Sequence, residues 1–164
     1  MTMKHTIEPF HDRAEAFAEE IGEDPLVAHL LLARGIGSPE AARDFFSPDY
    51  GRHLHDPFLF PDTGKIVERV RRAAAEREIV GIFGDYDADG VTGSAILREA
   101  LEGLGVRTVV HIPHKQGEGY GLSEKGLRVF RDAGAKLFFT VDCGITNVKE
   151  FAAAREMGLE GVVI

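Results

Sequence analysis

The spacing of apolar residues changes character near residue 62 and divides the chain into two parts. Before this point, apolar residues recur at helical intervals and predict helices over 14–21 and 25–33. Ser38 followed by Pro39 is a typical start for a third helix. We therefore expect residues 1–61 to form a helical N-terminal cap segment.

From residue 62 onward, short apolar runs alternate with amphipathic segments. Apolar runs predict strands at 79–83, 108–112, 137–141 and 161–164, with helical spacing before and between them. Buried strands separated by helices of about three turns are typical of a parallel sheet covered on both faces. The expected fold class is α/β, a doubly wound parallel sheet. The last run has the composition of a central strand, and we expect the fold to be interrupted there.

Composition fits a globular protein that buries a core. Of 164 residues, 44% are hydrophobic and 28% charged. No stretch approaches the roughly 18 apolar residues of a membrane span, and the N-terminus lacks a secretory signal. Cys143 is the single cysteine and has no partner for an internal disulfide. These features predict a cytoplasmic protein without a membrane anchor.

The formal net charge of −8 limits how this chain can bind nucleic acid. Proteins that coat DNA depend on lysine and arginine to neutralise phosphates, so the charge disfavours that class. An enzyme that holds phosphates through divalent cations can be acidic at its site, because the metal supplies the positive charge.

Three aspartates follow the first predicted strand, at alternate positions within the segment Gly84–Gly90. Asp85, Asp87 and Asp89 would repel one another unless a cation lies among them. In an extended segment, alternate side chains also point the same way. We interpret the three as ligands of a hard divalent metal; a solvated acidic turn is the alternative. An EF-hand is excluded, since its twelfth position is Ile96 and not glutamate.

A fourth acid, Asp142, follows the strand predicted at 137–141. The carboxyl ends of neighbouring parallel strands border one crevice, so Asp142 could complete a site with Asp87 and Asp89. A helix cap or turn is the alternative. The neighbouring Cys143 is expected to be a small buried apolar residue and not a nucleophile, because the sequence supplies no base for it.

The glycine-rich segment 111–123 is the third candidate. It has neither the dinucleotide-binding pattern nor a phosphate loop. His114, Lys115 and Tyr120 are plausible contacts for phosphates or bases. On composition alone, a glycine-rich surface loop is an equally good interpretation.

Two of these motifs resemble the RecJ branch of the DHH phosphoesterase family. Asp85–Gly90 resembles its first motif and Thr140–Gly144 its second. Further stretches look like the same branch: Leu31–Gly35, Phe45–Pro48, Asp56–Pro57, Ile112–Pro113 and Glu118–Ser123. The resemblance extends over nearly the entire chain.

The resemblance implies a 5′-to-3′ exonuclease on single-stranded DNA that acts in repair and recombination with manganese or magnesium. Asp87, Asp89 and Asp142 would be catalytic metal ligands, with Asp85 as a further participant. They would hold two ions roughly 3.5–4 Å apart. Nucleic-acid contacts are expected from His114, Lys115, Tyr120 and Ser123. Repair proteins are conceivable partners that the sequence does not identify.

Two departures from the family pattern affect these expectations. The family continues after the next strand with Asp-His-His, whereas this sequence ends at Ile164. We therefore expect an N-terminal fragment, truncated before that motif, whose metal site is incomplete and whose own activity is weak or absent. His114-Lys115 also stands where the family often has Asn-Arg, and lysine offers a point charge without a planar fork.

Three alternatives remain open. A haloacid-dehalogenase-like phosphatase fits the Asp87-x-Asp89-x-Val91 pattern, but it needs a Ser or Thr where this chain has His111-Ile112-Pro113. A degenerate scaffold could bind DNA or protein partners without catalysis. A DHH phosphodiesterase could act on short oligonucleotides or cyclic dinucleotides, although the cap segment and the Gly119–Gly121 loop favour the RecJ branch.

Overall fold

A computed structural model describes residues 9–114, 117, 119 and 121–164. The chain forms two compact units, one up to Asp56 and one over Pro57–Ile164. The boundary predicted from the sequence, after residue 61, lies a few residues further along. Each unit is considered by itself.

The first unit is helical, as its spacing predicts. Its helices are α1 (Ala14–Ile21), α2 (Pro25–Ala33), α3 (Pro39–Phe46) and the short α4 (Tyr50–His53). Ser38 Oγ accepts a hydrogen bond from Ala41 N at 3.2 Å, which confirms the predicted start of α3. Phe17, Leu31 and Ala42 form part of the buried core of this unit.

The second unit is a four-stranded parallel sheet with helices between the strands. It comprises η1 (Pro57–Leu59), α5 (Thr63–Ala75), β1 (Ile79–Gly84), α6 (Ala88–Gly103), β2 (Arg107–His111), α7 (Glu124–Asp132), β3 (Ala135–Val141), α8 (Val148–Glu156) and β4 (Glu160–Val163). The strand order is β2-β1-β3-β4, and every pair is parallel. The predicted α/β class is confirmed.

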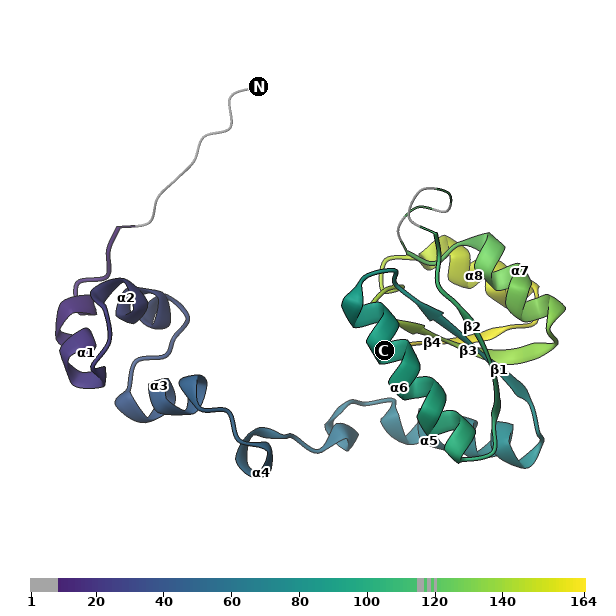
Figure 1. The fold of residues 1–164 in the computed structure, drawn as a ribbon, viewed down its shortest axis with the longest axis horizontal. Helices are drawn as coiled ribbons and strands as arrows, with labels where there is room; N and C mark the ends of the chain where they lie inside the picture. Colours follow the sequence, from purple (N-terminus) through teal and green to yellow (C-terminus); the bar gives the residue numbers. More distant parts are fainter. Residues whose placement is uncertain (1–8, 115–116, 118, 120) are drawn as a thin grey trace, which may run out of the picture. The chain divides into compact units, whose positions relative to one another are not determined.

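The helices cover both faces of this sheet, so it is doubly wound (Figure 1). Val80 and Ile82 of β1 are buried in one core cluster with residues of α5 and α6. Phe83 points to the other face and is buried with residues of α7 and α8. Strand side chains alternate between faces, so each face has its own apolar core.

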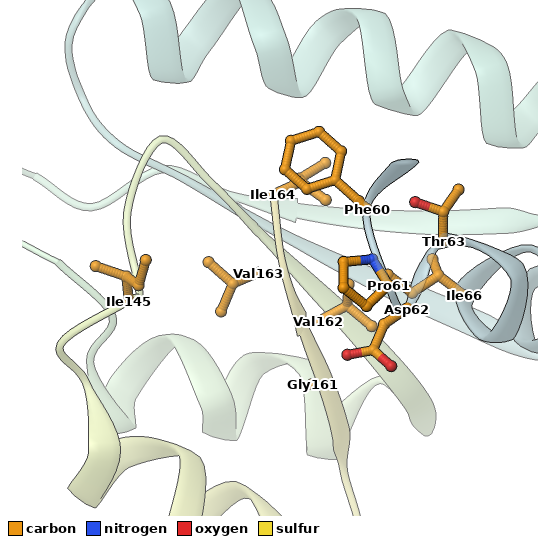
Figure 2. Close-up of a pocket in the computed structure, with 10 residues that line it drawn as sticks. All are labelled: Phe60, Pro61, Asp62, Thr63, Ile66, Ile145, Gly161, Val162, Val163 and Ile164. Atoms are coloured by element: carbon orange, nitrogen blue, oxygen red, sulfur yellow. The ribbon is translucent and has the colours of Figure 1, made fainter. Parts of the chain in front are cut away.

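Strand β4 is the last strand of the sheet along the chain and forms one of its edges. The composition of residues 161–164 favours a central strand, but β4 lies at an edge of the sheet, beside β3. An apolar groove of about 750 Å³ lies there, lined by Phe60, Ile66, Ile145, Val162 and the residues drawn with them in Figure 2. Among the described helices, none is long and apolar enough to cross a membrane.

Candidate metal centre

The candidate site lies at the point where the strand order reverses. From β1 the chain passes through α6 to β2, and from β3 it passes through α8 to β4 on the opposite side. In doubly wound sheets, the crevice beyond the strands opens at this point. Gly84 pairs with Val141, and Asp85 N donates to Val141 O at 3.1 Å. The residues that follow β1 and β3 are thereby brought together.

Three of the predicted acids gather at this place. Asp85, Asp87 and Asp142 each offer a carboxylate oxygen, and the three oxygens lie within 4.8 Å of one another. Oxygen ligands bind Mg²⁺ or Ca²⁺ at about 2.0–2.6 Å, so oxygens with this separation can share one cation.

Asp85 is the buried member of the cluster. It is 3% exposed, and Oδ1 has no hydrogen-bond partner among the described residues. A buried carboxylate oxygen without a hydrogen-bond partner costs stability, and a divalent cation would supply the missing interaction. The residues present therefore fit a metal ion.

Asp87 is fixed by its role at the start of α6. It is the N-cap residue, and Oδ1 accepts hydrogen bonds from Asp89 N and Gly90 N, both at 3.1 Å. The cap sets the position of the carboxylate at the N-terminus of α6, where the partial charge of the helix dipole is positive.

Glycines allow α6 to approach the strand ends closely. A Cβ on Gly90 would collide with the backbone of Asp85, and one on Gly93 would lie 2.8 Å from Val141 Cγ1. A Cβ on Gly84 would collide with Ser94 Oγ. These glycines were not among the site residues predicted from the sequence. The three-residue interval between Gly90 and Gly93, which places both on one helix face, is the signal that could have revealed them.

Asp142 has an unusual backbone conformation. Its φ is +57°, a left-handed conformation that non-glycine residues seldom adopt and that is often found at functional sites. The edge strand supports it, because Asp142 N donates to Ile164 O at 3.3 Å. Partial loss of solvent, followed by the charges of Asp87, Asp89 and Asp85, raises the pKa of Asp142. A pocket of about 390 Å³ adjoins it.

The other predicted site residues that the structure describes are not members of the cluster of three acids. Asp89 is exposed in the first turn of α6, outside the group of three. His114 is exposed, and its carbonyl accepts from Gly117 N at 2.9 Å. Ser123 caps α7, with Oγ accepting from Gly126 N at 3.2 Å. Lys115 and Tyr120 lie outside the described residues.

Cys143 does not have the properties of a nucleophile. Its side chain is partly buried, and Sγ donates to Phe83 O at 3.9 Å. Burial, and then the charge of Asp85, raises the pKa of the thiol to about 11. The thiol is therefore protonated at neutral pH, in keeping with the sequence interpretation.

Fold and site together define an α/β protein with a candidate divalent-metal centre at the switch point of its sheet. Residues 79–164 match the DHH family, N-terminal domain. The chain belongs to this family, as the sequence motifs predict. The match favours the DHH family over a haloacid-dehalogenase-like phosphatase.

The relatives that this chain resembles in sequence are much longer than the chain itself. It is 35% identical over 155 residues to the single-stranded-DNA-specific exonuclease RecJ of Bacillus subtilis, covering 94% of the chain and 20% of the relative. Identity to the RecJ of Thermus thermophilus is 38% over 139 residues, covering 82% and 21%. The chain thus spans about one fifth of the length of these relatives.

Two solved structures share the fold. Exonuclease RecJ bound to manganese matches with a TM-score of 0.56 and 38% identity, over 60% of this chain and 26% of that one. RecJ of Thermus thermophilus in complex with Mn²⁺ matches with a TM-score of 0.57 and 28% identity, over 92% and 20%. Both contain manganese, and this chain has an acidic cluster that could hold a metal ion.

Proposed function

We propose that this chain is part of a metal-dependent exonuclease that degrades single-stranded DNA from 5′ to 3′ in cytoplasmic DNA repair and recombination. The observation that carries the proposal is the gathering of Asp85, Asp87 and Asp142, with Asp85 Oδ1 buried and without a hydrogen-bond partner in the described part of the chain. Similarity to single-stranded-DNA-specific exonucleases supports the substrate class.

The carboxylates have distinct tasks in this proposal. Asp85 and Asp87 would hold Mn²⁺ or Mg²⁺ from the β1 side, and Asp142 would hold it from the β3 side. Asp89 is near enough for its charge to affect the pKa of Asp142, and it would contribute to a second ion at the exposed side. When bound, the metals supply an activated water and stabilise the leaving oxygen. His114, Lys115, Tyr120 and Ser123 would contact the DNA.

The negative charge of the chain affects how it can bind single-stranded DNA. Without a cation, the aspartates and the net charge of −8 repel a phosphodiester. A divalent ion held by the carboxylates would make the local charge at the strand ends favourable to phosphate. We therefore expect single-stranded DNA to bind more tightly with Mn²⁺ or Mg²⁺ present than without it.

Mn²⁺ binding by the chain tests the metal site directly. Binding removes the electron paramagnetic resonance signal of free Mn²⁺, so this signal should fall when the wild-type chain is added. In the Asp87→Asn/Asp142→Asn variant, the Kd for Mn²⁺ should be at least about tenfold higher. Asparagine keeps the cap of α6 and tolerates left-handed φ, so this variant should stay folded. Asp132→Asn/Glu156→Gln, which removes two exposed charges elsewhere in the unit, should bind like the wild type. Equal binding by all three proteins would refute the metal site.

Hydrolysis tests the activity. With 5′-labelled single-stranded DNA and Mn²⁺, we expect slow release of labelled mononucleotides, abolished by EDTA and by Asp87→Asn/Asp142→Asn. A chain that binds Mn²⁺ and releases nothing would refute hydrolysis by this chain. Faster cleavage of a dinucleotide than of long DNA would favour a DHH phosphodiesterase acting on short substrates.

A further inference from the structure

Asn147 stands at a helix start but does not act as a cap. It is the N-cap residue of α8, a position where an asparagine side chain ordinarily accepts from backbone N–H groups of the first turn. No such bond forms here. Instead, Nδ2 donates to Leu122 O at 3.3 Å and to Glu150 Oε2 at 3.1 Å. The amide is used to reach a different segment of the chain.

The backbone of Asn147 belongs to the loop that starts at Asp142. Asn147 N donates to Gly144 O at 3.0 Å and closes the turn. Gly144 has φ +104°, and a Cβ there would collide with Thr140 Oγ1. The turn between Asp142 and Asn147 is therefore held against the end of β3.

The segment that Asn147 reaches is fitted to it. Gly121 has φ +81°, and a Cβ at this position would lie 3.1 Å from Asn147 Oδ1. Leu122 is 3% exposed and packs in the core beneath α7 and α8. Ser123 then caps α7. The conformation of Gly121, its close approach to Asn147 and the hydrogen bond to Leu122 O all place the same short segment against Asn147.

We propose that Asn147 is a positioning residue, which holds segment 121–123 against the loop that carries Asp142. In this way the end of the proposed DNA-binding segment keeps a fixed position relative to the metal centre. The DNA part of this inference rests on the proposed function, whereas the anchoring of segment 121–123 does not. Among the described residues, the Asn147 side chain hydrogen-bonds to Leu122 and Glu150 and to none of the metal carboxylates, so metal binding should not depend on it.

Asn147→Asp tests the anchor with almost no change of shape. Aspartate cannot donate to Leu122 O and would be repelled by Glu150. Hydrogen–deuterium exchange should become about fivefold faster, or more, in the peptide spanning 121–127, because one lost hydrogen bond corresponds to roughly this factor. Thr146→Ala, at an exposed position in the same turn, is the matched control and should exchange like the wild type. Unchanged exchange in Asn147→Asp would refute the anchor.

A comparison of the Kd for single-stranded DNA with the Kd for Mn²⁺ tests the positioning role. For Asn147→Asp we expect the Kd for a fluorescent single-stranded oligothymidylate, in Mn²⁺ and before hydrolysis, to rise about five- to tenfold. The Kd for Mn²⁺ should change less than about twofold, well under the effect expected of a ligand or its support. A parallel loss of both affinities with a lower thermal midpoint would reduce Asn147 to a structural residue and overturn the proposal. Failure of the wild type to bind DNA would refute the proposed function, while the exchange measurement would still decide whether Asn147 anchors the segment.

Discussion

Asp85, Asp87 and Asp89 occupy alternate positions, yet their side chains do not share one environment. Alternate residues point the same way only while the backbone is extended. Here the helix starts at Ala88, so Asp87 becomes its cap and Asp89 lies in its first turn. The sequence could predict that acids cluster after β1. It could not predict where the extended backbone ends, and so did not separate Asp89 from the other two.

The pKa of Asp142 leads to a prediction about stability and pH. A raised pKa means that folding disfavours the charged carboxylate, so it costs stability above the raised value, and this cost disappears below the ordinary value of 3.8. Without metal, Asp142→Asn should therefore raise the thermal midpoint at neutral pH. The gain should shrink as the pH falls and vanish below 3.8. Circular dichroism melts over this pH range measure it, and a gain that stays constant with pH would contradict the electrostatic cause.

Helix α6 forms the wall of the site because Gly90 and Gly93 let its first turns approach the strand ends closely. Local helix signals predict its existence, but its distance from the sheet depends on Gly90 and Gly93 meeting particular atoms of other elements. Such contacts are tertiary, and helical periodicity does not contain them. The short helix α4 was missed for a related reason, since a single turn has too few residues to show a period.

Gly90→Ala should therefore damage the protein despite the better helix propensity of alanine. The new Cβ would collide with the Asp85 backbone, and we expect a loss of about 2 kcal/mol or more, together with weaker Mn²⁺ binding. Gly103→Ala in the same helix has open space and should be neutral or stabilising by up to about 1 kcal/mol. Chemical denaturation of both variants measures the difference. Equal effects would show that α6 is not held this closely.

Helix α5 is joined to the sheet by a largely buried charge. The Arg69 side chain is 9% exposed; Nη1 donates to Glu78 Oε2 at 2.8 Å, and Nε donates to Glu160 Oε2. Burial lowers the pKa of Arg69, but the hydrogen bonds and charges of Glu160 and Glu78 outweigh it and raise the pKa overall. The helical period identifies the apolar face of α5 but not this ion pair, because Glu160 lies 91 residues away.

Removal of this arginine should destabilise the second unit. Arg69→Ala leaves Glu78 and Glu160 without their shared partner, and we expect a loss of about 2–4 kcal/mol in the free energy of unfolding. Arg71→Ala, which breaks the exposed pair with Glu68, should cost less than about 1 kcal/mol. Urea denaturation of the two variants tests this. Similar losses would mean that burial does not strengthen the Arg69 interactions.

At the scale of the whole molecule, the class of fold was predictable and the arrangement of strands was not. Alternating strands and helices define an α/β protein, whichever strands are neighbours. The order β2-β1-β3-β4 creates the switch point and places Asp142 beside Asp85. Nothing in the periodicity distinguishes this order from others, which is why the sequence alone could only offer convergence of the strand ends as a possibility.

The division into two units gives metal binding a local signature within the whole chain. All the clustered carboxylates belong to the unit Pro57–Ile164, so linkage should stabilise that unit and leave the opening of α1–α3 unchanged. At about one hundred times its Kd, Mn²⁺ should add about 2.7 kcal/mol. In the wild type, hydrogen–deuterium exchange in β1 and β3 should then become slower when Mn²⁺ is added. In the Asp87→Asn/Asp142→Asn variant, Mn²⁺ should leave exchange in these strands unchanged. If Mn²⁺ slowed hydrogen–deuterium exchange equally in α1–α3, the two units would not respond independently, because metal bound at the strand ends would then stabilise the helical unit as well.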